Sequence, residues 1–280
     1  MRTKQIVVIV AVVAVMGYLY SLPVKGFLKP KETTQANAKM PAAKPKASLS
    51  IDAVSATAKA GLTPAAQQQI GVLENNLKTA AEADKVPAQK QLAKTWDDFN
   101  QAAPAGFYYL DIARKSNAPA DWILAGNRFN TAYKLTQDTA AQSTYIVNAT
   151  EAFTHANQLQ PDNLEAKTGL GVAYVNGGGM PMQGITLLLD VVKKDPKNHE
   201  ALLNLGMFSM KSGQFEKAVE RFKTLIAQKE EVEPYFYLAE SYKQLGRKDE
   251  AIAAYEKCKE LMGDPVAGQR IDEYIKELKK

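Results

Sequence analysis

The sequence is poor in the residues that most often carry catalysis and metal binding. Its 280 residues include one cysteine, Cys258, and two histidines, His155 and His199. A single cysteine excludes a disulfide within the chain. No cluster of cysteines or carboxylates surrounds the histidines at metal-ligand spacing. We therefore predict that the protein is not an enzyme and holds no cofactor. Cys258 occupies an interior position of a predicted helix, where a thiol is expected to be buried and inert.

The net positive charge is confined to the N-terminal part of the chain. The formal net charge is +5, but residues 25–59 alone carry seven lysines against two acidic residues. Arg2 and Lys4 add two further positive charges, so the residues from Gly61 onward are slightly acidic. A basic groove for nucleic acid is therefore not expected.

A stretch that is both uncharged and strongly apolar lies near the N-terminus. Ile6 to Val24 run for nineteen residues without a charge, close to the length that spans a hydrocarbon core of about 30 Å. The run ends in Tyr18, Tyr20 and Pro23 instead of small residues, which favours an uncleaved anchor over a cleaved signal peptide. We predict a single-pass transmembrane anchor in residues 1–24, which contacts the inner (cytoplasmic) membrane through residues 6–24.

The orientation of this anchor is less clearly marked. Cations stand on both sides of the apolar run, at Arg2 and Lys4 before it and at Lys25 and Lys29 after it, so the positive-inside rule is nearly balanced. We expect the C-terminal part to be extracytoplasmic, that is, periplasmic. The opposite orientation stays open.

Residues 25–60 contain few large apolar side chains and are rich in Lys, Ala and Pro. Such a composition cannot offset the entropy cost of ordering the chain. We predict a flexible linker over residues 25–60. Its lysines have two interpretations, a solvated tether or contact with anionic lipid head groups.

Strand patterns are lacking from the rest of the sequence, and helical periodicity replaces them. Thr63 precedes Pro64 as a helix N-cap would, and Ile70, Leu73 and Leu77 then follow at helical spacing. The fold class predicted for the region beyond the linker is therefore all-α.

Several positions recur at a fixed interval. Four pairs are separated by 33 residues: Leu205-Gly206 with Leu238-Ala239, Gly213 with Gly246, Ala218 with Ala251, and Phe222 with Tyr255. Leu170-Gly171 and Tyr174 occupy the same positions one unit earlier. A preceding unit begins at Trp122, Gly126 and Phe129 and ends at Phe153 and Pro161, with about eleven extra residues expected between its two helices.

This pattern resembles the tetratricopeptide repeat (TPR) family, whose unit of about 34 residues places small residues and aromatics at these positions of two helices. The resemblance implies a TPR-like α-solenoid of helical hairpins. We assign residues 61–118 to N-terminal helices with a degenerate repeat near 86–118, residues 119–263 to TPR repeats, and residues 264–280 to a C-terminal capping helix. In that helix Ile271, Ile275 and Leu278 would cover the last repeat.

Glycines concentrate in one stretch, NGGGMPMQG at 176–184. A phosphate-binding P-loop needs a lysine directly after its last glycine, and none follows before Lys193. The repeat alignment places Gly177 to Gly179 between paired helices, where glycine supplies positive φ for a tight corner. Met180, Pro181 and Met182 have a second interpretation, as an apolar tip that touches a partner.

The resemblance also implies that the first helix of each repeat lines a concave protein-binding groove. Its outward positions give this candidate site: Ile123, Asn127, Asn130, Thr168, Val172, Val175, Asn176, Leu203, Met207, Met210, Lys211, Phe236, Glu240 and Lys243. Five of them, Val172, Leu203, Met207, Met210 and Phe236, form an apolar stripe that helix pairing does not require. It would hold a partner peptide, unless the helix at 64–83 or the C-terminal helix covers it.

The predicted function is that of a non-enzymatic, membrane-anchored TPR scaffold that binds another protein or extended peptide. By analogy alone, protein export, folding or envelope assembly is the first process expected. The alternatives are a structural protein that self-associates into a homo-oligomer, and an adaptor of the cytochrome-maturation type.

Overall fold

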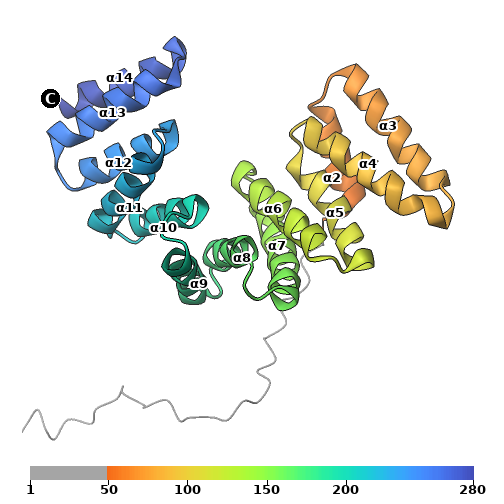
Figure 1. The fold of residues 1–280 in the computed structure, drawn as a ribbon. Helices are drawn as coiled ribbons and strands as arrows, with labels where there is room; N and C mark the ends of the chain where they lie inside the picture. The colour runs from red at the N-terminus through yellow and green to blue at the C-terminus, as the bar shows by residue number, and fades with distance from the viewer. Residues whose placement is uncertain (1–48) are drawn as a thin grey trace, which may run out of the picture. The chain divides into compact units, whose positions relative to one another are not determined.

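Every regular element in the part of the chain that the structure describes is a helix (Figure 1). The computed structural model describes residues 49–280, which lie within one compact unit. The predicted anchor at 1–24 and the linker residues 25–48 lie outside the described residues. Among the residues described, no helix is both long enough and apolar enough to cross a membrane.

The helices follow one another with short connections. In chain order they are α2 Ile51–Ala60, α3 Pro64–Thr79, the 3₁₀ turn η1 Glu82–Asp84, α4 Lys85–Asp98, α5 Ala102–Ser116, α6 Pro119–Leu135, α7 Thr139–Leu159, α8 Leu164–Gly177, α9 Pro181–Lys194, α10 His199–Lys211, α11 Phe215–Gln228, α12 Val232–Gln244, α13 Lys248–Met262 and α14 Pro265–Leu278.

Neighbouring helices pair into hairpins, and the hairpins stack. α6 packs against α7, α8 against α9, α10 against α11, and α12 against α13. The first helices also contact one another in series, because α6 touches α8, α8 touches α10, and α10 touches α12. The prediction of an all-α, TPR-like solenoid is thereby confirmed for the described residues.

Capping residues start several of these helices. The side chains of Asp138, Asn163 and Asn198 each accept a hydrogen bond from a backbone N–H in the first turn of α7, α8 and α10. These bonds satisfy N–H groups that have no partner within the helix. The corners after α10 and α12 use Gly213 at φ +74° and Gly246 at φ +72°, a backbone region that favours glycine.

Small residues allow the hairpins to approach one another closely. The ring of Phe153 in α7 is fully buried and lies between Gly126 of α6 and Gly169 of α8. A Cβ atom added at either glycine would come within 2.6 Å or 2.1 Å of that ring, respectively. A Cβ atom added at Gly206 would likewise come within 2.5 Å of the Phe222 ring. The recurring glycines and aromatics of the sequence are therefore the contacts that join helices.

The linker prediction is wrong for residues 51–60, which form α2. Ser50 caps this helix with a hydrogen bond from the N–H of Ala53 at 3.2 Å. α2 packs against α5, and Val54 is 5% exposed. A segment of low overall hydrophobicity thus gains order from one apolar face that meets a partner helix, which composition alone does not reveal.

The unit at 119–162 also differs from its prediction. α6 has 17 residues and α7 has 21, and only residues 136–138 separate them. The additional residues therefore lengthen both helices and do not form an insertion between them. The sequence contains no glycine or proline between 127 and 160, so nothing breaks either helix early.

The glycine stretch forms the corner between α8 and α9. Gly178 has φ +68°, which matches the expected role, whereas Gly177 is the last residue of α8. Gly184 has a separate role, because a Cβ atom there would lie 2.4 Å from the carbonyl oxygen of Gly171. This glycine permits close contact between α8 and α9.

Candidate functional site

A polar pocket opens on the face formed by the first helices α6, α8 and α10. We call it the α6–α8–α10 pocket; its volume is about 530 Å³, within the usual range of ligand sites. Four residues of the predicted groove line it, namely Asn127, Asn130, Thr168 and Val172. The remaining lining residues are Arg128, Thr131, Lys134, Glu165, Gly169, Asn198 and Glu200.

Two asparagines of α6 connect this helix to α8. The side-chain amide of Asn127 donates a hydrogen bond to Glu165 Oε1 at 2.7 Å. That of Asn130 donates to the backbone carbonyl of Gly169 at 3.2 Å. Asn130 Oδ1 is buried and has no hydrogen-bond partner among the described residues. Because Asn130 lines the pocket, a reorientation of its side chain would present this acceptor to a bound N–H group.

Charges of both signs surround the asparagines. Lys134 Nζ at the end of α6 lies 3.8 Å from Glu200 Oε1 at the start of α10. Arg128 Nε lies 2.6 Å from Asp97 Oδ1, in an ion pair whose geometry does not allow the Nε–H group to donate a hydrogen bond. Both pairs are partly exposed to solvent, so water screens them and leaves the charges available to a ligand.

The apolar stripe does not form an open surface. Val172 is 2% exposed and Leu203 is 5% exposed, because Val172 packs with Leu188 and Leu205 across two hairpins. Leu203, with Met207 and Met210 beside it, packs into the C-terminal core. The prediction that helix pairing does not require this stripe is wrong for Val172 and Leu203, whose burial follows from the stacking of successive hairpins.

The C-terminal helix contacts the far end of the stripe. The ring of Phe236 lies 6.2 Å from that of Tyr274 in α14, and Lys243 Nζ stands 5.5 Å above the Tyr274 ring. Glu240 accepts a hydrogen bond from the hydroxyl of Tyr255. α14 therefore covers Phe236 in part, as one of the two alternatives anticipated. α3, the other helix considered, packs instead against α2 and α4.

Thr168 and the predicted groove residues outside the pocket make local contacts. Ile123 is buried in the N-terminal core, and the hydroxyl of Thr168 donates to the backbone carbonyl of Leu164 at 2.8 Å. Val175 and Asn176 are half-buried near the end of α8, and Lys211 Nζ lies 5.9 Å above the ring of Phe208. The structure brings only the four residues named above into one pocket.

Sequence reasoning missed the charged lining of the pocket. Lys134, Glu165 and Glu200 belong to three different hairpins, and only stacking brings them together. Arg128 was also outside the outward positions considered. One available signal was the position of Glu200 in the first turn of α10, from which its carboxylate reaches Lys134 of α6.

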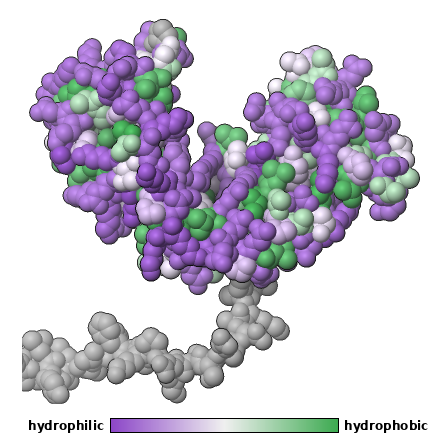
Figure 2. Space-filling model, viewed as in Figure 1, coloured by the Kyte–Doolittle hydropathy of each residue, from purple (hydrophilic) through white to green (hydrophobic). Residues whose placement is uncertain are grey.

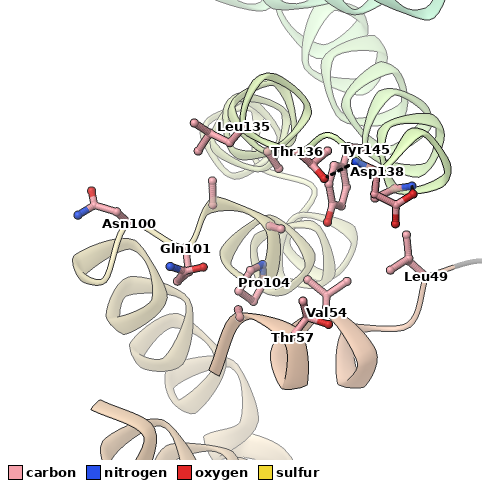
Figure 3. Close-up of a pocket in the computed structure, with 15 residues that line it drawn as sticks. Leu49, Val54, Thr57, Asn100, Gln101, Pro104, Leu135, Thr136, Asp138 and Tyr145 are labelled. Carbon is pink, nitrogen blue, oxygen red and sulfur yellow. Dashed lines mark hydrogen bonds between the residues drawn. The ribbon is translucent and has the colours of Figure 1, made fainter. Parts of the chain in front are cut away.

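A second hollow, of about 310 Å³, lies between α2, the start of α5 and the corner between α6 and α7. Figure 3 shows Val54 and Pro104 on two of its walls, with Tyr145 on a third. The rim includes Leu135, which is 70% exposed. On the side of the molecule seen in Figure 2, hydrophilic residues cover most of the surface and hydrophobic ones gather in separate areas.

The reactive residues of the sequence are not grouped. Cys258 is fully buried, and burial raises the pKa of its thiol. His155 stacks on Trp122 with ring centroids 4.4 Å apart, and His199 Nε2 lies 2.8 Å from Glu231 Oε2. Within residues 49–280 no group of three or more His, Cys, Asp or Glu is placed to hold a metal ion.

Comparison with known proteins places two segments in one family. Models described as "Tetratricopeptide repeat" match residues 187–220 and 232–265. The second match contains α12 and α13, and the first contains α10. No curated protein matches the sequence.

Solved structures of similar fold include TTC0263, a thermophilic TPR protein of Thermus thermophilus, which is 20% identical with a TM-score of 0.54. The alignment covers 67% of this chain and 97% of TTC0263. YrrB, described as a TPR protein with an unusual peptide-binding site, is 15% identical over 72% of this chain and 97% of its own, with a TM-score of 0.45. MamA is 18% identical over 61% and 94%, with a TM-score of 0.47.

At these identities the likeness shows the fold alone. The family models, the glycine and aromatic contacts between helices and the series of stacked hairpins all agree. Two segments of the chain, 187–220 and 232–265, therefore match tetratricopeptide repeats, and they lie within an all-helical solenoid.

Proposed function

We propose that the protein is a non-enzymatic scaffold that holds an extended segment of another protein in the α6–α8–α10 pocket. The observation that supports this most directly is the unpartnered acceptor Asn130 Oδ1 at the pocket wall. An extended peptide offers backbone N–H groups at regular intervals, and a buried acceptor without a partner favours such a donor.

The mixed charges of the pocket bear on which segment fits. Lys134 on α6 suits an acidic side chain of the partner, and Glu165 on α8 suits a basic one. A segment that carries both signs, with a small residue facing Asn130, would satisfy the pocket best. The half-buried Met207 and Met210 on α10 would then provide adaptable apolar contact beyond the polar part.

Site-specific photo-crosslinking in intact membranes tests this proposal. A photoreactive residue replaces Thr131, which is exposed and lines the pocket, or Glu216, an exposed control on α11. We expect a discrete crosslinked product from position 131 and none from 216. In the same background, Asn130→Leu and Lys134→Glu should each reduce the yield at position 131. Equal products from both positions, or a yield that neither substitution changes, would refute the proposal.

We further propose that residues 6–24 anchor the chain in the inner membrane and that the helical repeats are extracytoplasmic. The uncharged run of nineteen residues supports the anchor. The expected result is that the full chain resists extraction by carbonate and that deletion of residues 1–24 releases it. Protease added to spheroplasts, whose outer membrane has been opened, and to lysed spheroplasts tests the orientation, since digestion only after lysis would contradict an extracytoplasmic domain. By analogy alone, export, folding or envelope assembly is the process served.

A further inference from the structure

A second polar pocket lies where α2, α3, α4 and α5 meet. Its volume is about 510 Å³, and it shares no lining residue with the α6–α8–α10 pocket. The side chains of Ile51 and Leu77 form part of its wall, and polar side chains from all four helices form the rest. An apolar wall with a few converging polar groups is the usual composition of a site for a small molecule.

One residue that lines this pocket has a buried hydroxyl that forms no hydrogen bond. Ser55 in α2 is 3% exposed, and its Oγ makes no hydrogen bond with any described residue. The hydroxyl of Tyr108 in α5 lies near enough to Ser55 for the contact to lower the Tyr108 pKa in part, but the two groups do not reach hydrogen-bonding geometry. Buried polar groups in proteins are normally satisfied, so Ser55 Oγ is a place for a ligand atom.

The charges around these hydroxyls are not all balanced within the protein. Lys59 Nζ pairs with Glu74 Oε2 at 2.6 Å. Asp111 accepts only a long hydrogen bond, 3.5 Å from Gln89 Nε2, while Lys115 Nζ donates to Gln89 Oε1 at 3.0 Å. Among the described residues, neither Asp52 nor Asp111 forms an ion pair within 4.0 Å. Two carboxylates at the pocket are thus free to receive a cation.

The ionisation of Tyr108 agrees with this electrostatic picture. Burial raises its pKa to about 12, and the carboxylates of Glu74, Asp52 and Asp111 act in the same direction. The hydroxyl therefore stays protonated at neutral pH, and three carboxylates lie close enough to act on it, beside the lining lysines Lys59 and Lys78. A cationic group entering the pocket would be stabilised by the same carboxylates.

We propose that this pocket binds a small molecule that carries a primary ammonium group on a short aliphatic body. The ammonium group has three N–H donors, which match the two free carboxylates, Asp52 and Asp111, and Ser55 Oγ. The aliphatic part lies against Leu77 and Ile51. Lys78, at the end of α3, faces the same pocket and would meet the carboxylate of an amino acid, so the ammonium group can belong to an amino acid or to a simple amine.

Calorimetric titration of the full-length protein in detergent tests the proposal with four matched probes. They are n-butylamine, 1-butanol, butyrate and 4-aminobutyrate, which share a four-carbon body and differ in charge. We expect saturable binding of the two ammonium compounds and none of the alcohol or the anion. Tighter binding of 4-aminobutyrate than of n-butylamine identifies the amino-acid source, and the reverse order identifies a simple amine.

Variants locate the site. Ser55→Ala and Asp111→Asn should each weaken amine binding by about tenfold or more. Thr57→Ala, on the same helix, and Asp98→Asn, an exposed carboxylate of α4, are the matched controls and should not change it. Binding of the alcohol as tight as that of the amine would overturn the proposal, as would an absence of saturable amine binding by the unsubstituted protein. The comparison of amine with alcohol uses the unsubstituted protein. It therefore tests the proposal even if a variant loses helical circular dichroism. The result is also independent of the crosslinking at Thr131.

Discussion

The contact between Phe153 and two glycines gives the sharpest test of the repeat packing. A Cβ atom at Gly169 would lie 2.1 Å from Phe153 Cζ and 2.2 Å from Cε1, far inside ordinary van der Waals contact of about 3.5 Å. The ring cannot move away, because Gly126 confines it from α6 with a corresponding distance of 2.6 Å. Gly169→Ala should therefore overpack the junction between α7 and α8 and cost at least about 1–3 kcal/mol.

Helix propensity works in the opposite direction, which makes a matched control informative. Gly71 lies in the middle of α3, and a Cβ atom there would meet nothing within 4 Å. Gly71→Ala should stabilise the protein by about 0.5–1 kcal/mol, whereas Gly169→Ala should destabilise it. Urea unfolding followed by circular dichroism measures both. If Gly169→Ala also raised the free energy of unfolding, the close approach inferred around Phe153 would be incorrect.

Three other predictions concern packing, backbone conformation and pH. Ala218 is fully buried, so Ala218→Leu should cost about 1–3 kcal/mol, while Ala227→Leu on the exposed side of α11 should leave the melting temperature nearly unchanged. Gly178 has φ +68°, so Gly178→Ala should lower stability by about 1–2 kcal/mol in urea titration, and Gly179→Ala, where a Cβ atom meets open space, should be neutral. Burial raises the Tyr108 pKa from 10.0 to about 12. Because the pKa is higher in the folded state, the contribution of the protonated Tyr108 hydroxyl to the free energy of unfolding is fully present below pH 10 and is lost as the pH rises to about 12. The free energy of unfolding from urea titration should fall across that range, and the fall should be smaller in Tyr108→Phe; an identical pH dependence of the two proteins would contradict this.

The helical hairpins could be predicted because their determinants recur locally along the chain. Gly126 and Gly206 mark where helices meet. In the structure Gly126 lies against the ring of Phe153, and Gly206 lies against the ring of Phe222. Asn163 and Asn198 mark where helices begin. Each of these signals depends on residues within one or two neighbouring helices. A single sequence therefore contains enough information to place them.

Properties that depend on stacking could not be predicted in the same way. Val172 looks like an outward position of α8, but the next hairpin covers it and leaves 2% exposed. Ser55 and Tyr108 lie far apart in a segment taken to be partly a linker, yet α2 and α5 bring them to one pocket. In both cases the environment of the side chain is set by helices that are not adjacent in sequence. Helical periodicity carries no information about such neighbours.

The irregular repeat at 119–159 explains why the polar pocket forms where it does. The other first helices are short, with 14 residues in α8 and 13 in both α10 and α12, whereas α6 has 17. A first helix of 13 or 14 residues starting at Pro119 would end before Lys134. The extra turn of α6 therefore carries Lys134 to within 3.8 Å of Glu200 on α10 and extends the wall that begins at Asn127 and Asn130. The longer α6 thus adds a charged residue to the wall of the α6–α8–α10 pocket, and it is at this pocket that we expect a partner to bind.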